Sequence, residues 1–215
     1  MKPVYIVANW KSNKTVAETR SWLESFTLPS KDCTVIICAP FTLLHFLNEQ
    51  KLQVHLGAQD VSPFGEGAYT GEVSAKQLKE LVEWVIIGHS ERRKYLKESD
   101  EELSFEVLQA KQAGLGVIFC VPDENIHIPP GVEVVAYEPQ DAIGTGKSED
   151  PTRMNAVIAG LKKRSKSLYG LYGGSVTPQN VASFIKEPSI DGVLVGGASL
   201  DAVAFQQLIE NAYHS

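Results

Sequence analysis

Apolar residues along the chain fall into eight short runs that are rich in Val and Ile. These runs do not alternate with polar residues, which is typical of strands buried on both faces of a parallel sheet. We therefore expect eight strands, beginning at Val4, Cys33, Val54, Trp84, Gly116, Val132, Leu168 and Gly192.

Most of the runs are separated by segments with helical periodicity. Asp100 is the predicted N-cap of one helix, and Gly114 stands where a glycine commonly ends a helix. Thr177 followed by Pro178 predicts the start of another helix, since proline favours the first helical position. The helices with the clearest patterns are predicted over residues 15–26, 100–114, 177–186 and 199–213.

Eight strands alternating with helices in 215 residues predict an α/β fold, a closed (β/α)8 barrel (TIM barrel), as a single domain over residues 1–215. This arrangement is favoured over an open doubly wound sheet. Residues 122–131 carry Pro122, Pro129 and Pro130, so we expect no helix between the fifth and sixth strands. Ten extended residues reach roughly 33 Å, enough to return along one strand. Without that helix, parts of both strands should be exposed.

Composition argues against several classes of protein. The formal net charge is -6 and the longest basic run is the mixed segment 162–166, so a nucleic-acid partner is not expected. No apolar run approaches the roughly 18 residues of a membrane span, and the N-terminus shows no cleavage site, so we expect a cytoplasmic protein. Cys33, Cys38 and Cys120 lie within or beside predicted strands without C-x-x-C spacing, which indicates buried thiols rather than disulfides or zinc ligands.

Chemically active side chains and glycine pairs follow the predicted strands, at the end where barrels of this kind carry their chemistry. Taken singly, each has an ordinary explanation, such as surface charge, a structural histidine, a paired carboxylate or a tight turn. Taken together they indicate one site, because independent accidents would all have to fall at the same mouth. Glycine pairs after the last two strands favour a phosphorylated ligand. The residues are Asn9, Trp10, Lys11, His89, Glu91, Glu138, Gly173, Gly174, Ser175, Gly196 and Gly197.

Several segments resemble signature sequences of the triosephosphate isomerase family. They cover nearly the whole chain, from Ala8 to Leu200, and IGHSERR and AYEP with AIGTG are the most specific among them. The full set is ANWK, GAQD, YTGEVS, IIGHSERR, AYEP, AIGTGK, YGGSV and LVGGASL. The resemblance implies an isomerase of glycolysis and gluconeogenesis that interconverts dihydroxyacetone phosphate and D-glyceraldehyde 3-phosphate through an enediolate, without a metal or an organic cofactor.

The resemblance also implies a role for each matching residue. Glu138 would be the general base, and His89 a neutral electrophile that donates hydrogen bonds to the substrate oxygens. Lys11 would stabilise the charge that develops on the enediolate, Asn9 would contact the substrate, and Glu91 would pair with Lys11. Backbone N–H groups for the phosphate would come from Gly144, Ser175, Gly196 and Gly197.

Residues 139–147 would form a lid over the bound phosphate. When the lid closes, Ile143 and Leu194 should surround Glu138 with apolar surface and strip water from its carboxylate, which makes it more basic. The Gln-Asp pair at 140–141 stands where many family members have Val-Trp, so we expect a modest change in lid kinetics.

The segment 59–72 lacks a helical or strand period and is too long for a simple connector. In the family this loop inserts into a neighbouring subunit, so the resemblance implies a homodimer in which Thr70 contacts the active site of the second copy. Two other functions stay open: a different phosphosugar isomerase or lyase on the same barrel, and a phosphometabolite-binding protein without turnover. The match at Lys11, His89 and Glu138 favours the triosephosphate isomerase reaction over both.

Overall fold

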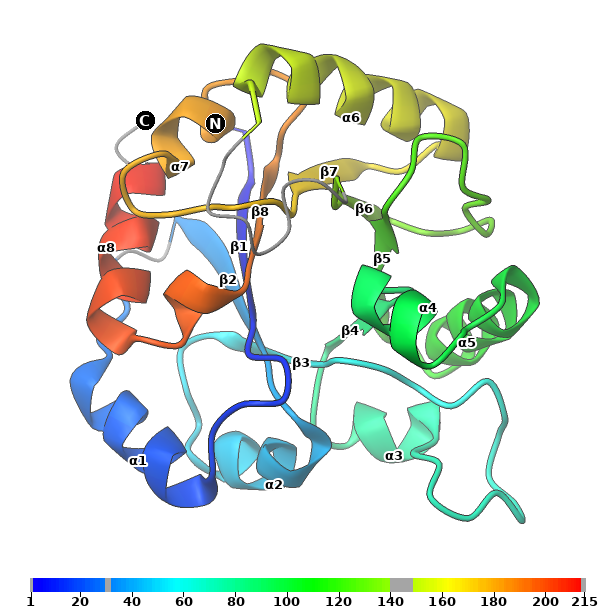
Figure 1. The fold of residues 1–215 in the computed structure, drawn as a ribbon. Helices are drawn as coiled ribbons and strands as arrows, with labels where there is room; N and C mark the ends of the chain where they lie inside the picture. The colour runs from blue at the N-terminus through cyan, green and yellow to red at the C-terminus, as the bar shows by residue number, and fades with distance from the viewer. Residues whose placement is uncertain (1, 30–31, 140–148, 214–215) are drawn as a thin grey trace.

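The computed structural model describes residues 2–29, 32–139 and 149–213. Eight parallel strands pair in chain order and β8 pairs with β1, so the sheet closes into a barrel (Figure 1). The predicted (β/α)8 barrel is therefore confirmed. The strands are β1 (Val4–Asn9), β2 (Cys33–Cys38), β3 (His55–Ala58), β4 (Trp84–Ile87), β5 (Gly116–Val121), β6 (Val134–Tyr137), β7 (Tyr169–Tyr172) and β8 (Gly192–Val195).

Each of the eight predicted apolar runs contains one of these strands. The first two strands pair residue for residue over their full lengths. β6 begins two residues later than the run that starts at Val132, and the carbonyl of Val132 accepts a hydrogen bond from Ser167 Oγ, a side chain that precedes β7. Apolar composition thus locates a strand, whereas the ladder of hydrogen bonds sets its ends.

Helices lie outside the ring of strands (Figure 1). The helix of residues 100–112 begins with a capping box, in which Ser99 Oγ accepts from the Glu102 backbone and Glu102 Oε2 accepts from the Ser99 backbone. The prediction of Asp100 as the N-cap is thus wrong by one residue, whereas Gly114, with φ of 76°, ends this helix as predicted. The helices are α1 (Val16–Ser25), α2 (Phe41–Glu49), α3 (Ala75–Lys79), α4 (Ser90–Tyr95), α5 (Asp100–Gln112), α6 (Pro151–Ser165), α7 (Val181–Ile185), the 3-10 helix η1 (Gly197–Ser199) and α8 (Ala202–Tyr213).

The predicted start of a helix at Thr177 and Pro178 is wrong, because α7 begins at Val181. Residues 178–180 form a turn instead, and the side chain of Asn180 accepts a hydrogen bond from the Thr177 backbone. Short polar side chains of this kind compete with a helix for backbone groups, which delays the helix by one turn.

No helix joins β5 to β6, as predicted, and residues 122–133 form turns and extended chain. The expected exposure of these two strands is not found, because every residue in 117–121 and 134–137 is buried. Helices α5 and α6 pack against the two strands, and Ile126 and Ile128 of the connection pack against the core. The neighbouring helices and these two side chains replace the cover that a further helix would supply.

Apolar side chains form two layers, one inside the barrel and one between the barrel and its helices. The inner layer includes Tyr5 and Val7 from β1 and Leu194 from β8. Asn9 continues the two-residue alternation of β1, so its side chain faces the barrel interior at the C-terminal mouth. The three cysteines are free and buried, as predicted. Among the described helices, none is long and apolar enough to cross a membrane.

Candidate active site

The C-terminal ends of five strands surround a pocket of about 280 Å³. Ile143, Gly144 and the Gln-Asp pair at 140–141 lie outside the described residues, so the prediction of a lid is not tested. Thr70 lies on the exposed loop between β3 and α3. The predicted residues that line the pocket are Asn9, Lys11, His89, Glu138, Gly173, Gly174, Ser175, Leu194, Gly196 and Gly197.

Glu138 lies one residue beyond the end of β6, and its side chain is only 2% exposed. Its Oε1 lies 3.0 Å from His89 Nε2, and its Oε2 accepts a hydrogen bond from the Ser90 backbone at 3.2 Å. A Cβ on Gly173 would stand 2.8 Å from Glu138 Cγ, closer than real Cβ contacts allow. The glycine after β7 therefore makes the space that the carboxylate occupies.

His89 is the N-cap of α4, and its ring is fixed from both sides. Nδ1 accepts a hydrogen bond from the Glu91 backbone at 3.2 Å. Because a backbone amide only donates, Nδ1 carries no proton in this geometry and the proton of the neutral ring sits on Nε2, facing Glu138. Burial lowers the pKa of His89. The carboxylates of Glu138 and Glu91 raise the pKa by more than burial lowers it, so it lies above its ordinary value.

Lys11 reaches the same mouth from the end of β1. Its Nζ lies 2.5 Å from Glu91 Oε1. The Lys11 backbone has φ of 51°, which is unusual for a residue with a side chain. It is held there because its N–H donates to Asn9 Oδ1 at 3.0 Å and its carbonyl accepts from Gln59 Nε2 at 3.0 Å. This strained backbone conformation places the Lys11 side chain at the pocket.

Backbone of Gly196 and Gly197 lines the side of the pocket next to Lys11. A Cβ on Gly196 would lie 3.5 Å from Lys11 Cε, whereas a Cβ on Gly197 would meet nothing within 4 Å. Gly174 has a packing role, because a Cβ there would stand 2.1 Å from the hydroxyl oxygen of Tyr172. The bare backbone at 196–197 leaves room for a phosphate beside a cation.

Sequence reasoning missed two residues that shape the site. Gln59 donates to the carbonyls of both Lys11 and Cys38, at 3.0 and 2.9 Å, and so holds the end of β1 to that of β2. The thiol of Cys120 on β5 is hydrogen-bonded to Glu138, and burial together with this carboxylate raises the pKa of the thiol. Gln59 directly follows β3 and could have been found by its position at a strand end, whereas Cys120 lies within β5 and has no such signal. Val176, Thr177 and Ala198 complete the lining of the pocket.

Comparison with known proteins decides the family. The family model described as triosephosphate isomerase matches residues 4–128 and 130–212. The chain is 37% identical to the triosephosphate isomerase of Synechocystis sp., with 97% of this chain and 98% of the relative covered. The chain belongs to the triosephosphate isomerase family.

Other triosephosphate isomerases agree with this assignment. That of Trichormus variabilis is 39% identical, with 97% of this chain and 99% of the relative covered. The crystal structure of triosephosphate isomerase from Bartonella henselae superposes with a TM-score of 0.87 at 29% identity, covering 100% of both chains. The alignment with the Synechocystis protein runs over 238 positions, more than the 215 residues of this chain, so the relative carries residues that this chain lacks. The chain is thus a compact member of the triosephosphate isomerase family.

Proposed function

We propose that the chain interconverts dihydroxyacetone phosphate and D-glyceraldehyde 3-phosphate with Glu138 as the base, His89 as the electrophile and Lys11 as the stabilising cation. The observation that carries these roles is the convergence of all three side chains on one pocket at the mouth of the barrel. Family membership supports the reaction, and the geometry supports the division of labour.

Substrate binding has to separate the base from the electrophile. Glu138 Oε1 and His89 Nε2 lie 3.0 Å apart, a distance that leaves no room for a substrate between them. Glu138 would therefore swing away from His89 and the Ser90 backbone to face the C1 and C2 carbons. The Nε2–H of His89, freed from the carboxylate, would then donate to the substrate oxygens.

The proton transfers balance with these groups alone. Glu138 removes a proton from C1 of dihydroxyacetone phosphate, which leaves an enediolate with negative charge on O2. The Nζ of Lys11 and the Nε2–H of His89 stabilise that charge in a site from which water is largely excluded. The hydroxyl proton passes from O1 to O2, and Glu138 returns its proton to C2, which gives the aldehyde. No step uses a metal or an organic cofactor.

The remaining predicted residues position the substrate. Gly196 and Gly197 supply backbone for the phosphate next to Lys11, with Ser175 after the neighbouring strand β7 and Gly144 from the lid as further donors. Leu194, 3% exposed on β8, supplies apolar surface to the pocket. Closure of the lid with Ile143 would complete that apolar surround and make the Glu138 carboxylate a stronger base.

We also propose that this single barrel domain of residues 1–215 works as a homodimer in the cytoplasm. The loop between β3 and α3 presents Phe64 and Tyr69, each 45% exposed, with rings stacked 4.2 Å apart at 6°. Exposed, preorganised aromatic side chains favour burial in a second copy of the chain. Thr70 follows Tyr69 directly and would reach the site of that copy. Sedimentation should then give about twice 23.5 kDa, and a clean monomer would contradict the dimer.

Steady-state turnover tests the reaction itself. The purified chain should convert D-glyceraldehyde 3-phosphate to dihydroxyacetone phosphate, with a rate proportional to enzyme concentration and without added metal. Binding of inorganic phosphate, measured in parallel, separates the alternatives. Phosphate binding without turnover would favour a phosphometabolite-binding protein, and turnover of a different phosphosugar alone would favour another isomerase or lyase.

A further inference from the structure

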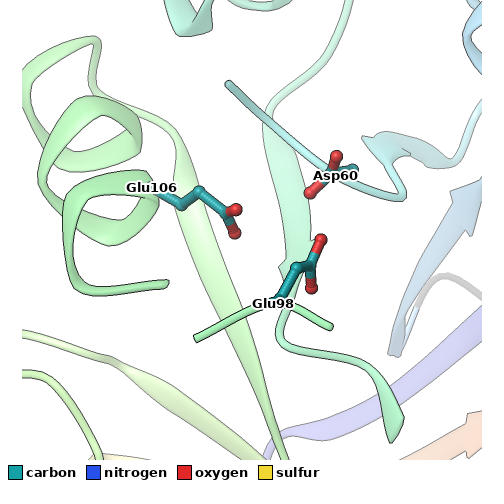
Figure 2. A group of neighbouring side chains, drawn as sticks. All are labelled: Asp60, Glu98 and Glu106. Atoms are coloured by element: carbon teal, nitrogen blue, oxygen red, sulfur yellow. The ribbon is translucent and has the colours of Figure 1, made fainter. Parts of the chain in front are cut away.

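Three carboxylates gather outside the site described above. Asp60 follows β3, Glu98 lies between α4 and α5, and Glu106 lies on α5. Figure 2 shows their carboxylates pointing toward one another from three segments of the chain. One carboxylate oxygen from each residue lies within 4.8 Å of the other two. The pocket of the proposed isomerase reaction includes none of them.

The cluster is buried and incompletely paired. Glu106 is 3% exposed, and the side chain of Glu98 is 8% exposed. Each of the three residues has one buried oxygen without a hydrogen-bond partner among the described residues, namely Asp60 Oδ1, Glu98 Oε2 and Glu106 Oε2. Buried polar atoms in folded proteins are nearly always paired. Three unpaired oxygens on three neighbouring side chains therefore indicate a missing positive partner.

Charge leads to the same conclusion. Arg92 makes two contacts with the cluster. Its Nη2 lies 2.5 Å from Asp60 Oδ2, and its Nε donates a hydrogen bond to Glu98 Oε1. Arg93 also acts on Glu98, but its guanidinium pairs with Asp100. Arg92 therefore offsets one of the three negative charges, which leaves two. The fully ionised cluster is thus unfavourable unless a cation binds.

We propose that Asp60, Glu98 and Glu106 bind one divalent cation of the size of Ca²⁺. Carboxylate oxygens are the preferred ligands of hard cations, and a double positive charge matches the two charges that Arg92 leaves. Because one oxygen of each residue lies within 4.8 Å of the other two, some point lies within roughly 2.8 Å of all three oxygens, close to the Ca–O range of about 2.3–2.6 Å. Mg²⁺, with Mg–O near 2.1 Å, requires a tighter arrangement.

A cationic side chain from another molecule fits the observations less well, since a residue 3% exposed such as Glu106 is out of reach of a surface side chain. A bound ion would join the start of the β3–α3 loop to α5 and to the segment before it. It would also fix Arg92, the neighbour of the Glu91 that pairs with Lys11. The ion is therefore expected to stabilise the fold, and the isomerase reaction does not require it.

Calcium titration of the chelator-treated protein tests this site independently of turnover. Isothermal titration with CaCl2 should give one ion per chain. The melting temperature should rise by about 5–10 °C when Ca²⁺ reaches 100 times its dissociation constant. Glu106→Gln, which keeps the shape and removes the charge, should lose most of this rise. Glu101→Gln, an exposed glutamate on the same helix, is the matched control and should keep it.

A second variant separates loss of the cation site from misfolding of Glu106→Gln. Asp60→Asn changes a proposed ligand on a different segment and should also lose the rise in melting temperature. If the wild-type protein shows neither binding heat nor a shift with CaCl2, the site does not exist, and the carboxyls pair with one another through protons. The proposal is also wrong if Glu106→Gln responds to Ca²⁺ as strongly as the wild type.

Discussion

Glu138 Oε1 lies 3.0 Å from His89 Nε2, so the proposed base and the proposed electrophile are hydrogen-bonded to each other in this structure. The second oxygen of Glu138 is held by the Ser90 backbone. If Glu138 is the base, its carboxylate, which also has the Cys120 thiol as a hydrogen-bond partner, has to give up the hydrogen bonds to His89 and the Ser90 backbone before it acts. The substrate then has to replace it as the partner of His89. In the proposed mechanism, this exchange would keep the base buried until the substrate replaces it at His89.

Loss of the His89 donor should slow the chemical step. We expect His89→Gln to lower kcat by about 10²–10³-fold, the usual effect of removing a donor to a developing oxyanion. His45→Gln, on the exposed face of α2 with a side chain 76% exposed, is the matched control and should leave kcat unchanged. Steady-state kinetics of both variants check this, and a kcat for His89→Gln close to that of the wild type would remove His89 from the reaction.

The space at Gly173 should be needed for turnover. In Gly173→Ala the new Cβ would stand 2.8 Å from Glu138 Cγ, so the base has to shift and kcat should fall at least tenfold, because misplacement by about 1 Å costs on this scale or more. Gly160→Ala in α6 is the matched control, since its Cβ meets nothing within 4 Å. That control should keep full activity and gain about 0.5–1 kcal/mol of stability. Equal rates in both variants would contradict the steric argument.

The charge state of His89 should limit activity at acid pH. Its pKa is raised by Glu138 and Glu91, so the ring gains a proton as the pH falls through a value above the ordinary one. Because the proposed electrophile is the neutral ring, kcat/KM should decline over that range on the acid side. Glu91→Gln removes one of the raising charges and should move the decline to lower pH, whereas ionisation of the substrate phosphate would not respond to this change. An unmoved pH profile would show that His89 is not the group that titrates.

The ion pair at the other end of the barrel should matter for stability rather than for rate. Asp191 Oδ2 lies 2.5 Å from Lys162 Nζ and accepts from the Gly170 backbone at 2.8 Å, with a side chain 8% exposed. Asp191→Ala leaves both partners unpaired and should cost about 3 kcal/mol in the free energy of unfolding, measured in urea. Glu24→Ala, at an exposed position of α1, should change it by less than about 0.5 kcal/mol. A similar change in both variants would show that the pair contributes nothing.

The barrel could be predicted because its strands are buried on both faces and so appear as uninterrupted apolar runs. The first residue of a helix is harder to predict from sequence. Ser99 and Asp100 are both good N-cap residues, and only the reciprocal hydrogen bonds with Glu102 make Ser99 the N-cap. The exposure expected for β5 and β6 was wrong because the packing of Ile126 and Ile128 has no periodic signal. Local pattern therefore gives the elements, and tertiary contacts decide how they end and what covers them.

The residues that line the pocket could be predicted from their positions at the ends of strands. The hydrogen bonds between their side chains could not. The pairing of Glu138 with His89 joins residues far apart in the chain and depends on the register of β4, β5 and β6. The acidic cluster was invisible for the same reason, because Glu106 follows the pattern of an ordinary helix and only folding brings it to Asp60. Side-chain geometry across strands is the information that a single sequence lacks.

Replacement of the proposed base is the most direct test of the central claim. Glu138→Gln keeps the shape of the side chain and removes its capacity to accept a proton from carbon, so kcat should fall by about 10²–10⁴-fold. Binding of inorganic phosphate should stay within about threefold of the wild type, since the phosphate contacts are unchanged. A kcat close to that of the wild type, with the variant purified free of host isomerase, would contradict the assignment of Glu138 as the base.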